Sequence, residues 1–365
     1  MEDRSEATAR SAFWGRSPGL AAGCCLLMLV AGCALGPSTV ARDRFELTTA
    51  IADSWKTQML LNMVKLRYGD TPVFLDVSSV ITQYAVETQV NVAASWAAPL
   101  GPAANILGLG GSGKYTDRPT VTYSPMTGEK FARSLMTHIP VNSLLSLIQT
   151  GYPIDLVFRL CTHSINGVQN RYGGGARARQ ADPEFYSLLE RMRRVQRSGA
   201  IGLKVTKIDK DQAVALVFRA KTDPESLEDI QAIRGALGID PQAEEFRVVY
   251  GTAASSSREL AILSRSIFEI LVDLASYIEV PEAHITEKRV NPVSADAAGP
   301  LVRIHSARET PADAFVALPY QGYWFWIDNR DMPSKGLFSS LMLLFTLLET
   351  GGKEGAPVVT ISAGG

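Results

Sequence analysis

The amino-acid sequence predicts an α+β fold of mixed helices and antiparallel strands, with one long N-terminal β-hairpin. Two patterns predict this fold class. Apolar residues recur every three or four positions in some segments and at alternate positions in others, which are the spacings of helices and half-buried strands. These segments also follow one another without the regular strand–helix–strand order of a parallel sheet. No segment of about 20 to 50 residues recurs, which argues against a repeat architecture.

The composition is that of a globular protein with room for two domains. The chain has 365 residues, of which 46% are hydrophobic and 20% are charged. A domain takes about 150 residues. The 36 basic and 37 acidic residues leave a net charge of −1. Because no overall positive field would attract phosphates, we expect no nucleic-acid partner.

Residues 1–32 have the layout of a signal peptide, in which arginines precede an apolar run from Leu20 to Val30. That run has about 11 residues, whereas a membrane-spanning helix needs about 20. The run ends in Val30-Ala31-Gly32-Cys33. In this motif the chain resembles the bacterial lipoproteins, whose lipobox is cut before a cysteine that then carries lipid. The resemblance implies that residues 1–32 are removed and that Cys33 is lipidated.

The same resemblance implies a location. Ala34, rather than an aspartate, follows the cysteine, which in this family implies release to the outer membrane, with a tether over 33–41 and the body in the periplasm. The other two cysteines near the N-terminus would leave with the leader, so Cys161 would be the only internal thiol and we expect no disulfide. The chain also looks like uncharacterised envelope lipoproteins of Gram-negative type, which implies no activity.

Residues 42–180 are expected to hold a helix, a long hairpin and a helical cluster. Apolar residues at helical spacing predict a helix over 42–67. The pattern then changes to alternation, which predicts a β-hairpin from Val73 to Tyr123. Prolines divide 129–170 into three short helices, because proline is tolerated in a first helical turn.

Residues 181–365 are predicted to form a second, α+β domain after a basic, glycine-rich link that ends at Gln180. Asp182 and Pro183 have the types expected at the start of a helix. Ser256 and Glu259 have the spacing of a capping box. The predicted helices cover 183–197, 225–237, 260–278 and 335–348, and the predicted strands cover 201–207, 213–219, 246–250, 301–305, 314–318, 323–327 and 358–361.

Motifs that suggest catalysis lack the context that their chemistry needs. Gly108–Lys114 matches the start of a phosphate-binding loop, but the residues after it continue as a strand, whereas the phosphate must sit on a helix N-terminus. The four histidines lack metal-ligand spacing, and no nucleophile motif is present. We therefore predict no catalytic residue, cofactor or metal, and a periplasmic hydrolase is the least favoured alternative.

Two polar clusters are candidate interaction sites. Asp328, Arg330 and Asp331 follow a hydrophobic strand, and Arg191 and Arg194 belong to a run of basic residues that begins at position 171. The simpler interpretation of the first cluster is a turn before a helix capped by the next serine. The simpler interpretation of the second is a solvated helix face.

The hairpin is also a candidate membrane element over residues 83–116. Along each strand, apolar residues alternate with polar residues, as in a transmembrane strand of about 9 to 11 residues. A lone hairpin would leave backbone groups unpaired in lipid. A pore would therefore need a ring of copies, a layout similar to the curli-secretion lipoprotein pore. The alternative is a hairpin packed on the body.

From these patterns we predict a non-enzymatic lipoprotein, anchored to the outer membrane through Cys33, with a structural or assembly role in the cell envelope. The alternative is an oligomeric pore or secretion component in which each copy donates residues 83–116. The expected partners are the membrane and either other copies of the chain or other envelope proteins.

Overall fold

A computed structural model describes residues 37–95, 106–174, 178–208, 211–219, 223–293 and 296–349. The fold is α+β, as predicted. The leader, Cys33 and the strand predicted over 358–361 lie outside the described residues. By its internal contacts the chain forms two units, Met1–Trp55 and Lys56–Gly365. No helix in the described part of the chain is both long and apolar enough to cross a membrane.

The first described element is helix α2 (Pro37–Arg67), which confirms the helix predicted over 42–67. Its buried side chains lie in its last turns, where Leu60, Met63 and Val64 are fully buried. The helix is followed by Gly69, whose φ of 76° favours glycine.

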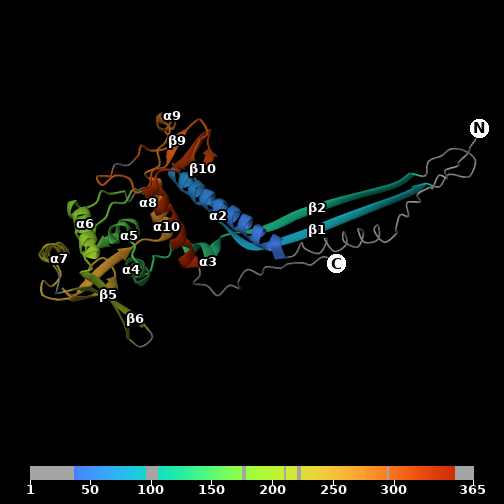
Figure 1. The fold of residues 1–365 in the computed structure, drawn as a ribbon. Helices are drawn as coiled ribbons and strands as arrows, with labels where there is room; N and C mark the ends of the chain where they lie inside the picture. Colours follow the sequence, from blue (N-terminus) through green and yellow to red (C-terminus); the bar gives the residue numbers. More distant parts are fainter. Residues whose placement is uncertain are drawn as a thin grey trace, which may run out of the picture. The chain divides into compact units, whose positions relative to one another are not determined.

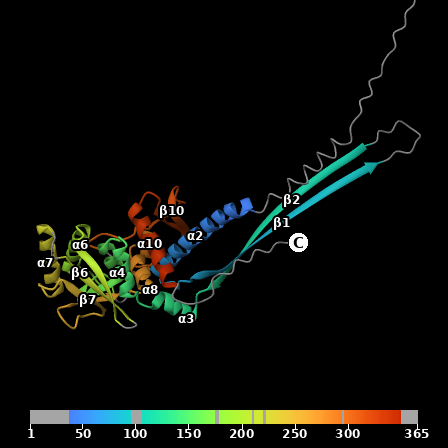
Figure 2. The same cartoon turned by 60° about the horizontal axis from the view of Figure 1, so that its bottom comes forward.

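Strands β1 (Leu75–Ser95) and β2 (Ile106–Pro125) form the predicted long hairpin. They pair with each other in antiparallel register from Leu75↔Pro125 to Ser95↔Ile106, with one irregularity between Val77 and Ser79. The two strands run side by side in both Figure 1 and Figure 2. Among the described residues, no other strand joins this two-stranded sheet.

The helical cluster contains α3 (Gly128–Phe131), the π-helical turn η2 (Ala132–Met136), α4 (Val141–Gln149) and α5 (Ile154–Cys161). The prediction that the last of these helices continues to a cap at Asn166-Gly167 is wrong, because α5 ends at Cys161. The chain instead forms β3 (Thr162–Ile165) and β4 (Val168–Gln169), which turn at Asn166 and Gly167 with φ values of 45° and 86°. Asn-Gly is the preferred dipeptide of such two-residue hairpin turns.

A six-stranded sheet has the order β4-β3-β8-β7-β6-β5. Its other strands are β5 (Ile201–Ile208), β6 (Asp211–Phe218), β7 (Glu245–Tyr250) and β8 (Glu259–Ser264), and only β7 and β8 pair in parallel. Figure 2 shows β6 beside β7. Since β3 pairs with β8, residues 42–180 and 181–365 contribute to one sheet, and the boundary predicted at residue 180 does not separate two sheets.

Helices α6 (Pro183–Arg197), α7 (Pro224–Leu237) and α8 (Ile267–Ala275) complete this part of the body. The prediction of a single helix over 260–278 is wrong in its first part, which is strand β8. The capping box is formed by Ser266 and Glu269 and not by the predicted Ser256 and Glu259. A short, wholly apolar run such as the one from Leu260 does not distinguish a strand from a buried helix.

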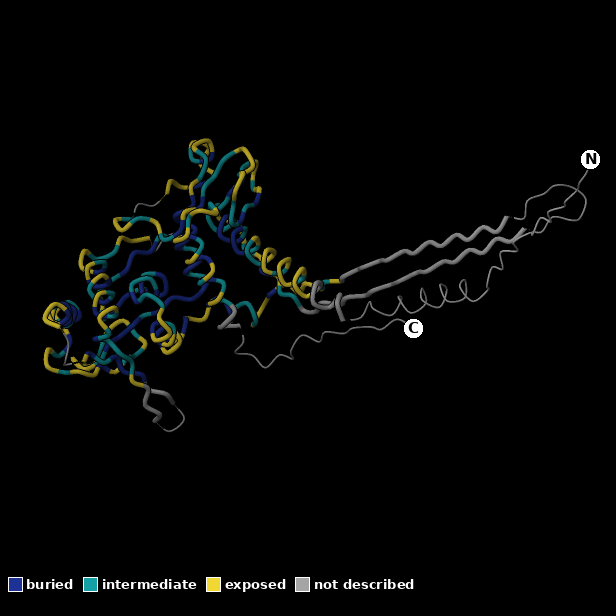
Figure 3. Tube along the Cα trace, in the orientation of Figure 1, coloured by how far each residue is buried: buried dark blue, intermediate teal, exposed yellow. Residues whose placement is uncertain are grey.

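The C-terminal part contains α9 (Glu282–Thr286) and a sheet of order β10-β11-β9. Its strands are β9 (His305–Ala307), β10 (Ala314–Tyr320) and β11 (Tyr323–Asp328), so the strand predicted over 301–305 begins later. Helix α10 (Met332–Glu349) ends the described chain. Within the unit Lys56–Gly365, buried residues from the helices and both larger sheets form one hydrophobic core (Figure 3).

Candidate functional site

The predicted polar cluster after β11 forms a turn and a helix cap. Asp328 accepts a hydrogen bond from the backbone N–H of Arg330 at 2.7 Å. Asp331 accepts from the backbone N–H of Ser334 at 3.1 Å and from its hydroxyl at 2.7 Å. Asp331, rather than the predicted Ser334, therefore caps α10. The Arg330 side chain is 86% exposed and lies 3.9 Å from Asp313.

The predicted basic face of α6 is tied to the neighbouring helix. Arg191 donates to Asp229 of α7 at 2.8 Å, and Arg194 donates to both oxygens of the same carboxylate at 2.7 Å. The Asp229 side chain is only 6% exposed. The pKa of Asp229 is lowered, chiefly by the hydrogen bond from Arg194. These two arginines hold α6 against α7, an intramolecular role that the sequence pattern did not indicate.

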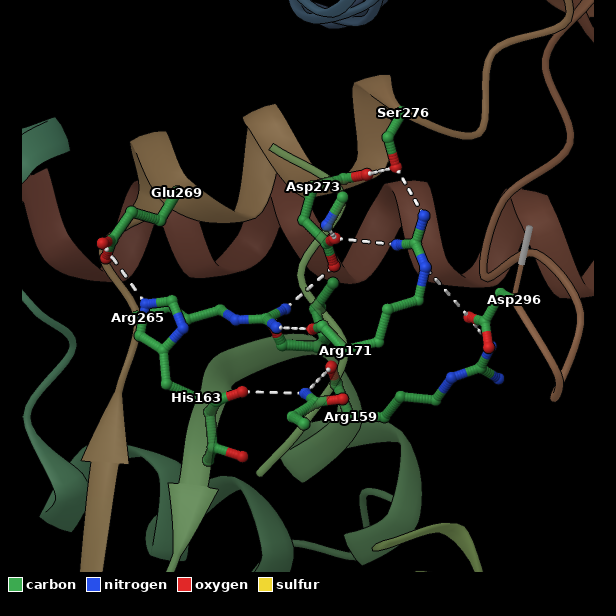
Figure 4. A network of polar contacts seen from close by, with 12 residues as sticks. Arg159, His163, Arg171, Arg265, Glu269, Asp273, Ser276 and Asp296 are labelled. Atoms are coloured by element: carbon green, nitrogen blue, oxygen red, sulfur yellow. Dashed lines mark hydrogen bonds and ion pairs between the residues drawn. The ribbon is translucent and has the colours of Figure 1, made fainter. Parts of the chain in front are cut away.

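The residue that sequence reasoning misplaced most is Arg171. The basic run that begins at this residue predicts a solvated side chain, yet Arg171 is 2% exposed and lies inside the body. Its partner is Asp273 of α8, whose Oδ1 accepts from Arg171 Nη1 at 2.9 Å and from the Gly173 backbone N–H at 2.6 Å. The other oxygen of Asp273 accepts from Arg265 Nη1 at 2.9 Å. One buried carboxylate thus neutralises two buried guanidinium groups (Figure 4).

Other donors of these arginines are also used, although Arg265 Nε has no hydrogen-bond partner among the described residues. Arg171 Nη2 donates to the Ser276 hydroxyl at 3.0 Å, and its guanidinium lies 4.3 Å from the centre of the Tyr277 ring. Arg265 donates to the backbone carbonyls of Leu160 and Arg171. These contacts join the end of α5, the segment after β4 and the end of α8.

Asp296 is a second centre of the same network. Its side chain is 2% exposed and accepts from Tyr186 and Tyr277, each at 2.6 Å, and from Arg159 Nη2 at 2.9 Å. Burial alone would raise the pKa of Asp296, but the hydrogen bonds from these donors lower it below its usual value. Asp296 thereby fixes the segment after α9 to α5, α6 and the end of α8. We call the residues Arg159, Arg171, Arg265, Asp273 and Asp296 the buried charge network.

The buried charge network is a structural element by its chemistry. Each of its guanidinium groups donates to one of its two carboxylates, so the buried charges are paired. The Nε atoms of Arg159 and Arg265 are buried without a hydrogen-bond partner among the described residues. Among the described residues, no group of three His, Cys, Asp or Glu side chains is placed to hold a metal ion. Cys161 is buried, and burial raises the pKa of its thiol to about 12, so the thiol stays protonated.

The root of the hairpin has its own set of specific contacts, made by two amides one helical turn apart on α2. Gln58 accepts from the backbone N–H of Leu75 at 2.8 Å and donates to its carbonyl at 3.1 Å. Asn62, which is fully buried, makes the same pair of bonds to Val73 at 2.9 and 2.8 Å. Side chains at positions i and i+4 of a helix lie on one face. The backbone N–H and C=O groups of alternate residues in a strand point to the same edge. The two amides therefore hold the start of β1 against α2.

Beyond the root, the register places the apolar positions of the two strands together. Val86 lies opposite Tyr115, Val92 opposite Leu109, and Ala94 opposite Leu107. The neighbouring pairs are polar, with Glu87 opposite Lys114 and Gln89 opposite Ser112. Because directly opposed residues share a face, the hairpin has one apolar and one polar face over this stretch.

No protein-family model matches the chain, and neither a curated protein nor a solved structure matches it. By its geometry, the candidate functional element is the hairpin, because its two strands extend well beyond their root and pair with no other described strand.

The His163–Glu269 contact gives the body an acid-sensitive component. His163 Nε2 lies 3.3 Å from Glu269 Oε1. The pKa of Glu269 is lowered from 4.5 to about 2, chiefly by its hydrogen bond with His163, although burial opposes the shift. A carboxyl group whose pKa is lowered on folding stabilises the fold above its unfolded pKa, and this contribution is lost as the pH falls through the folded pKa.

We expect the free energy of unfolding to fall less steeply between pH 4.5 and 2 in Glu269→Gln than in the unaltered protein. Urea unfolding at a series of pH values measures this difference. Other carboxyl groups with lowered pKa values, such as Asp296, contribute equally to both proteins and cancel in the comparison. Parallel pH profiles for the two proteins would contradict the assignment.

Proposed function

We propose that this protein is a non-enzymatic lipoprotein of the outer membrane, anchored through lipid on Cys33, with its body in the periplasm and a structural or assembly role in the cell envelope. The lipobox Val30-Ala31-Gly32-Cys33 supports the anchor. Each buried methylene of an acyl chain contributes about 0.8 kcal/mol, and more than one chain is needed for durable attachment.

The observation that carries the assembly role is the hairpin. An isolated two-stranded sheet is marginally stable in water, yet β1 and β2 have 21 and 20 residues and pair with no other described strand. The root contacts of Gln58 and Asn62 hold its start in a defined place. A long element with a fixed root, which pairs with no other described strand, is suited to joining another protein, which is what an envelope assembly component does.

Replacement of Cys33 by Ser is expected to abolish incorporation of labelled palmitate and to remove the protein from the outer-membrane fraction. Cys24→Ser is the matched control, because that cysteine would leave with the leader. Metabolic labelling followed by fractionation of the cells measures both effects. Palmitate label that persists in Cys33→Ser would contradict the anchor.

A pore is the second candidate function, and one observation favours it. Over residues 83–116 the register places most of the apolar positions opposite one another and most of the polar positions opposite one another, which is the pattern of transmembrane barrels. In this function each copy donates one hairpin to a ring, and the polar face lines the channel. The purified protein would then give conductance in liposomes, and liposomes that stay electrically tight would exclude the pore while leaving the anchor in place.

A further inference from the structure

The two halves of the hairpin differ in how their outer edges are protected. We call Tyr84–Ser95 of β1 with Ile106–Asp117 of β2 the distal half, and Leu75–Gln83 with Arg118–Pro125 the proximal half. An exposed strand edge carries backbone groups that can pair with another chain. Proteins prevent such pairing with prolines, with bulges or by covering the edge.

The contacts of Gln58 establish which backbone groups face outward. Both the N–H and the C=O of Leu75 are bonded to Gln58, so they point away from β2. The opposed pair Leu75↔Pro125 is therefore a non-hydrogen-bonded pair, and the nitrogen of Pro125 also faces outward. Backbone direction alternates along a strand, so the nitrogen of Pro119 faces outward as well.

The proximal half is thus protected on both edges. Along β2, Pro119 and Pro125 remove two outward N–H donors. Along β1, Gln58 covers Leu75, and the pairing is irregular between Val77 and Ser79. A further strand would find few regular partners on either edge.

The distal half lacks both the prolines and the register shift. Neither of its strand segments contains a proline, and the register runs without a shift from Tyr84↔Asp117 to Ser95↔Ile106. Both outer edges therefore keep a regular row of donors and acceptors. The protected edges thus end where the alternation of apolar and polar positions begins. This contrast indicates that pairing with a further strand is prevented near the root and permitted in the distal half.

From this contrast we infer that the distal halves of neighbouring copies of this chain pair edge to edge, with β1 of one copy antiparallel to β2 of the next. A second copy is the occupant because one hairpin has two unprotected edges. A strand from a different protein would satisfy only one of them, whereas identical hairpins joined head to tail satisfy both, and they form a ring when the rotation from copy to copy closes. This inference names the partner of the hairpin and rests on its proposed role as the assembly element.

Two separate proline variants test this inference, one that removes an outward N–H from the distal half of β2 and one that removes an outward N–H from its proximal half. Gly113 and Val121 have the same parity as Pro119, so a proline at either position leaves the pairing with β1 intact. We expect the full-length protein in detergent to form a discrete oligomer, Gly113→Pro to be monomeric, and Val121→Pro to keep the mass of the oligomer. Sedimentation measures the masses, and the melting temperature of the body confirms that each variant is folded.

Cross-linking between two differently tagged copies gives a second readout that does not depend on folding of a proline variant. One copy carries Thr88→Cys and the other carries a cysteine at one of the positions 107–117. We expect disulfide-linked pairs of copies for these distal cysteines. We expect none for the proximal control, in which one copy carries Thr82→Cys and the other carries Val121→Cys. A monomeric unaltered protein, an oligomeric Gly113→Pro, or equal cross-linking in both halves would overturn the inference. Because these measurements use purified protein, they are independent of the palmitate test of the anchor.

Discussion

Replacement of Asp273 by Asn is expected to lower the free energy of unfolding by about 3 to 5 kcal/mol, the usual cost of breaking a buried ion pair. The change keeps the shape of the side chain but removes the charge that neutralises Arg171 and Arg265. Both guanidinium groups are almost fully buried, at 2% and 0% side-chain exposure, so water cannot replace the lost carboxylate. The amide would also place an N–H group where an oxygen now accepts hydrogen bonds.

The matched control is Asp313→Asn, at a carboxylate that is half exposed and 3.9 Å from an exposed arginine. Such surface pairs contribute about 0 to 1 kcal/mol. Urea unfolding monitored by tryptophan fluorescence compares the two variants. If Asp273→Asn were as mild as the control, the buried charge network would not hold the body together as described.

Replacement of Gly173 by Ala is expected to destabilise the protein by about 3 kcal/mol, at the upper end of the range for overpacking a well-packed interior. A Cβ atom at this position would lie 2.0 Å from the hydroxyl oxygen of Ser276 and 2.5 Å from its Cβ. The second contact is with an atom attached directly to the backbone of the α8 end, so a change of rotamer does not relieve it. The segment after β4 would have to move away from α8, which lengthens the bond from Gly173 to Asp273.

Gly202→Ala in β5 is the control, because a Cβ there meets nothing within 4 Å, and we expect a change of less than about 0.5 kcal/mol. Thermal unfolding of both variants measures the effect. The double variant Gly173→Ala with Asp273→Asn should cost less than the sum of the single changes, since both disturb the same contacts. Additive losses would indicate that the two residues act separately.

The elements with a clear period could be predicted from the sequence. The helix that ends at Arg67 and the hairpin of β1 and β2 follow from uninterrupted spacing over many residues. Strand β8 could not be predicted, because the run from Leu260 is apolar on every side and its strand pairing with β7 depends on residues elsewhere in the chain. The turn at Asn166 and Gly167 carried a usable signal, since Asn-Gly favours a hairpin over a helix end.

The buried charge network was not predictable from sequence spacing. Arg171 and Asp273 are 102 positions apart, and an arginine within a basic run ordinarily lies in solvent. The nearest sequence signal was the pair Gly173-Gly174, which in retrospect reports a close approach of the backbone to α8. The protected and unprotected halves of the hairpin were likewise hidden, because the direction of Pro119 follows from the contacts of Gln58 and not from the sequence alone.

Native mass spectrometry of the detergent-purified protein tests the central claim most directly, since one spectrum reports both the anchor and the assembly. We predict a discrete oligomer whose subunits begin at Cys33 and carry the mass of the attached acyl chains. A monomer without lipid, at any protein concentration measured, would contradict a lipid-anchored envelope component assembled through its hairpins.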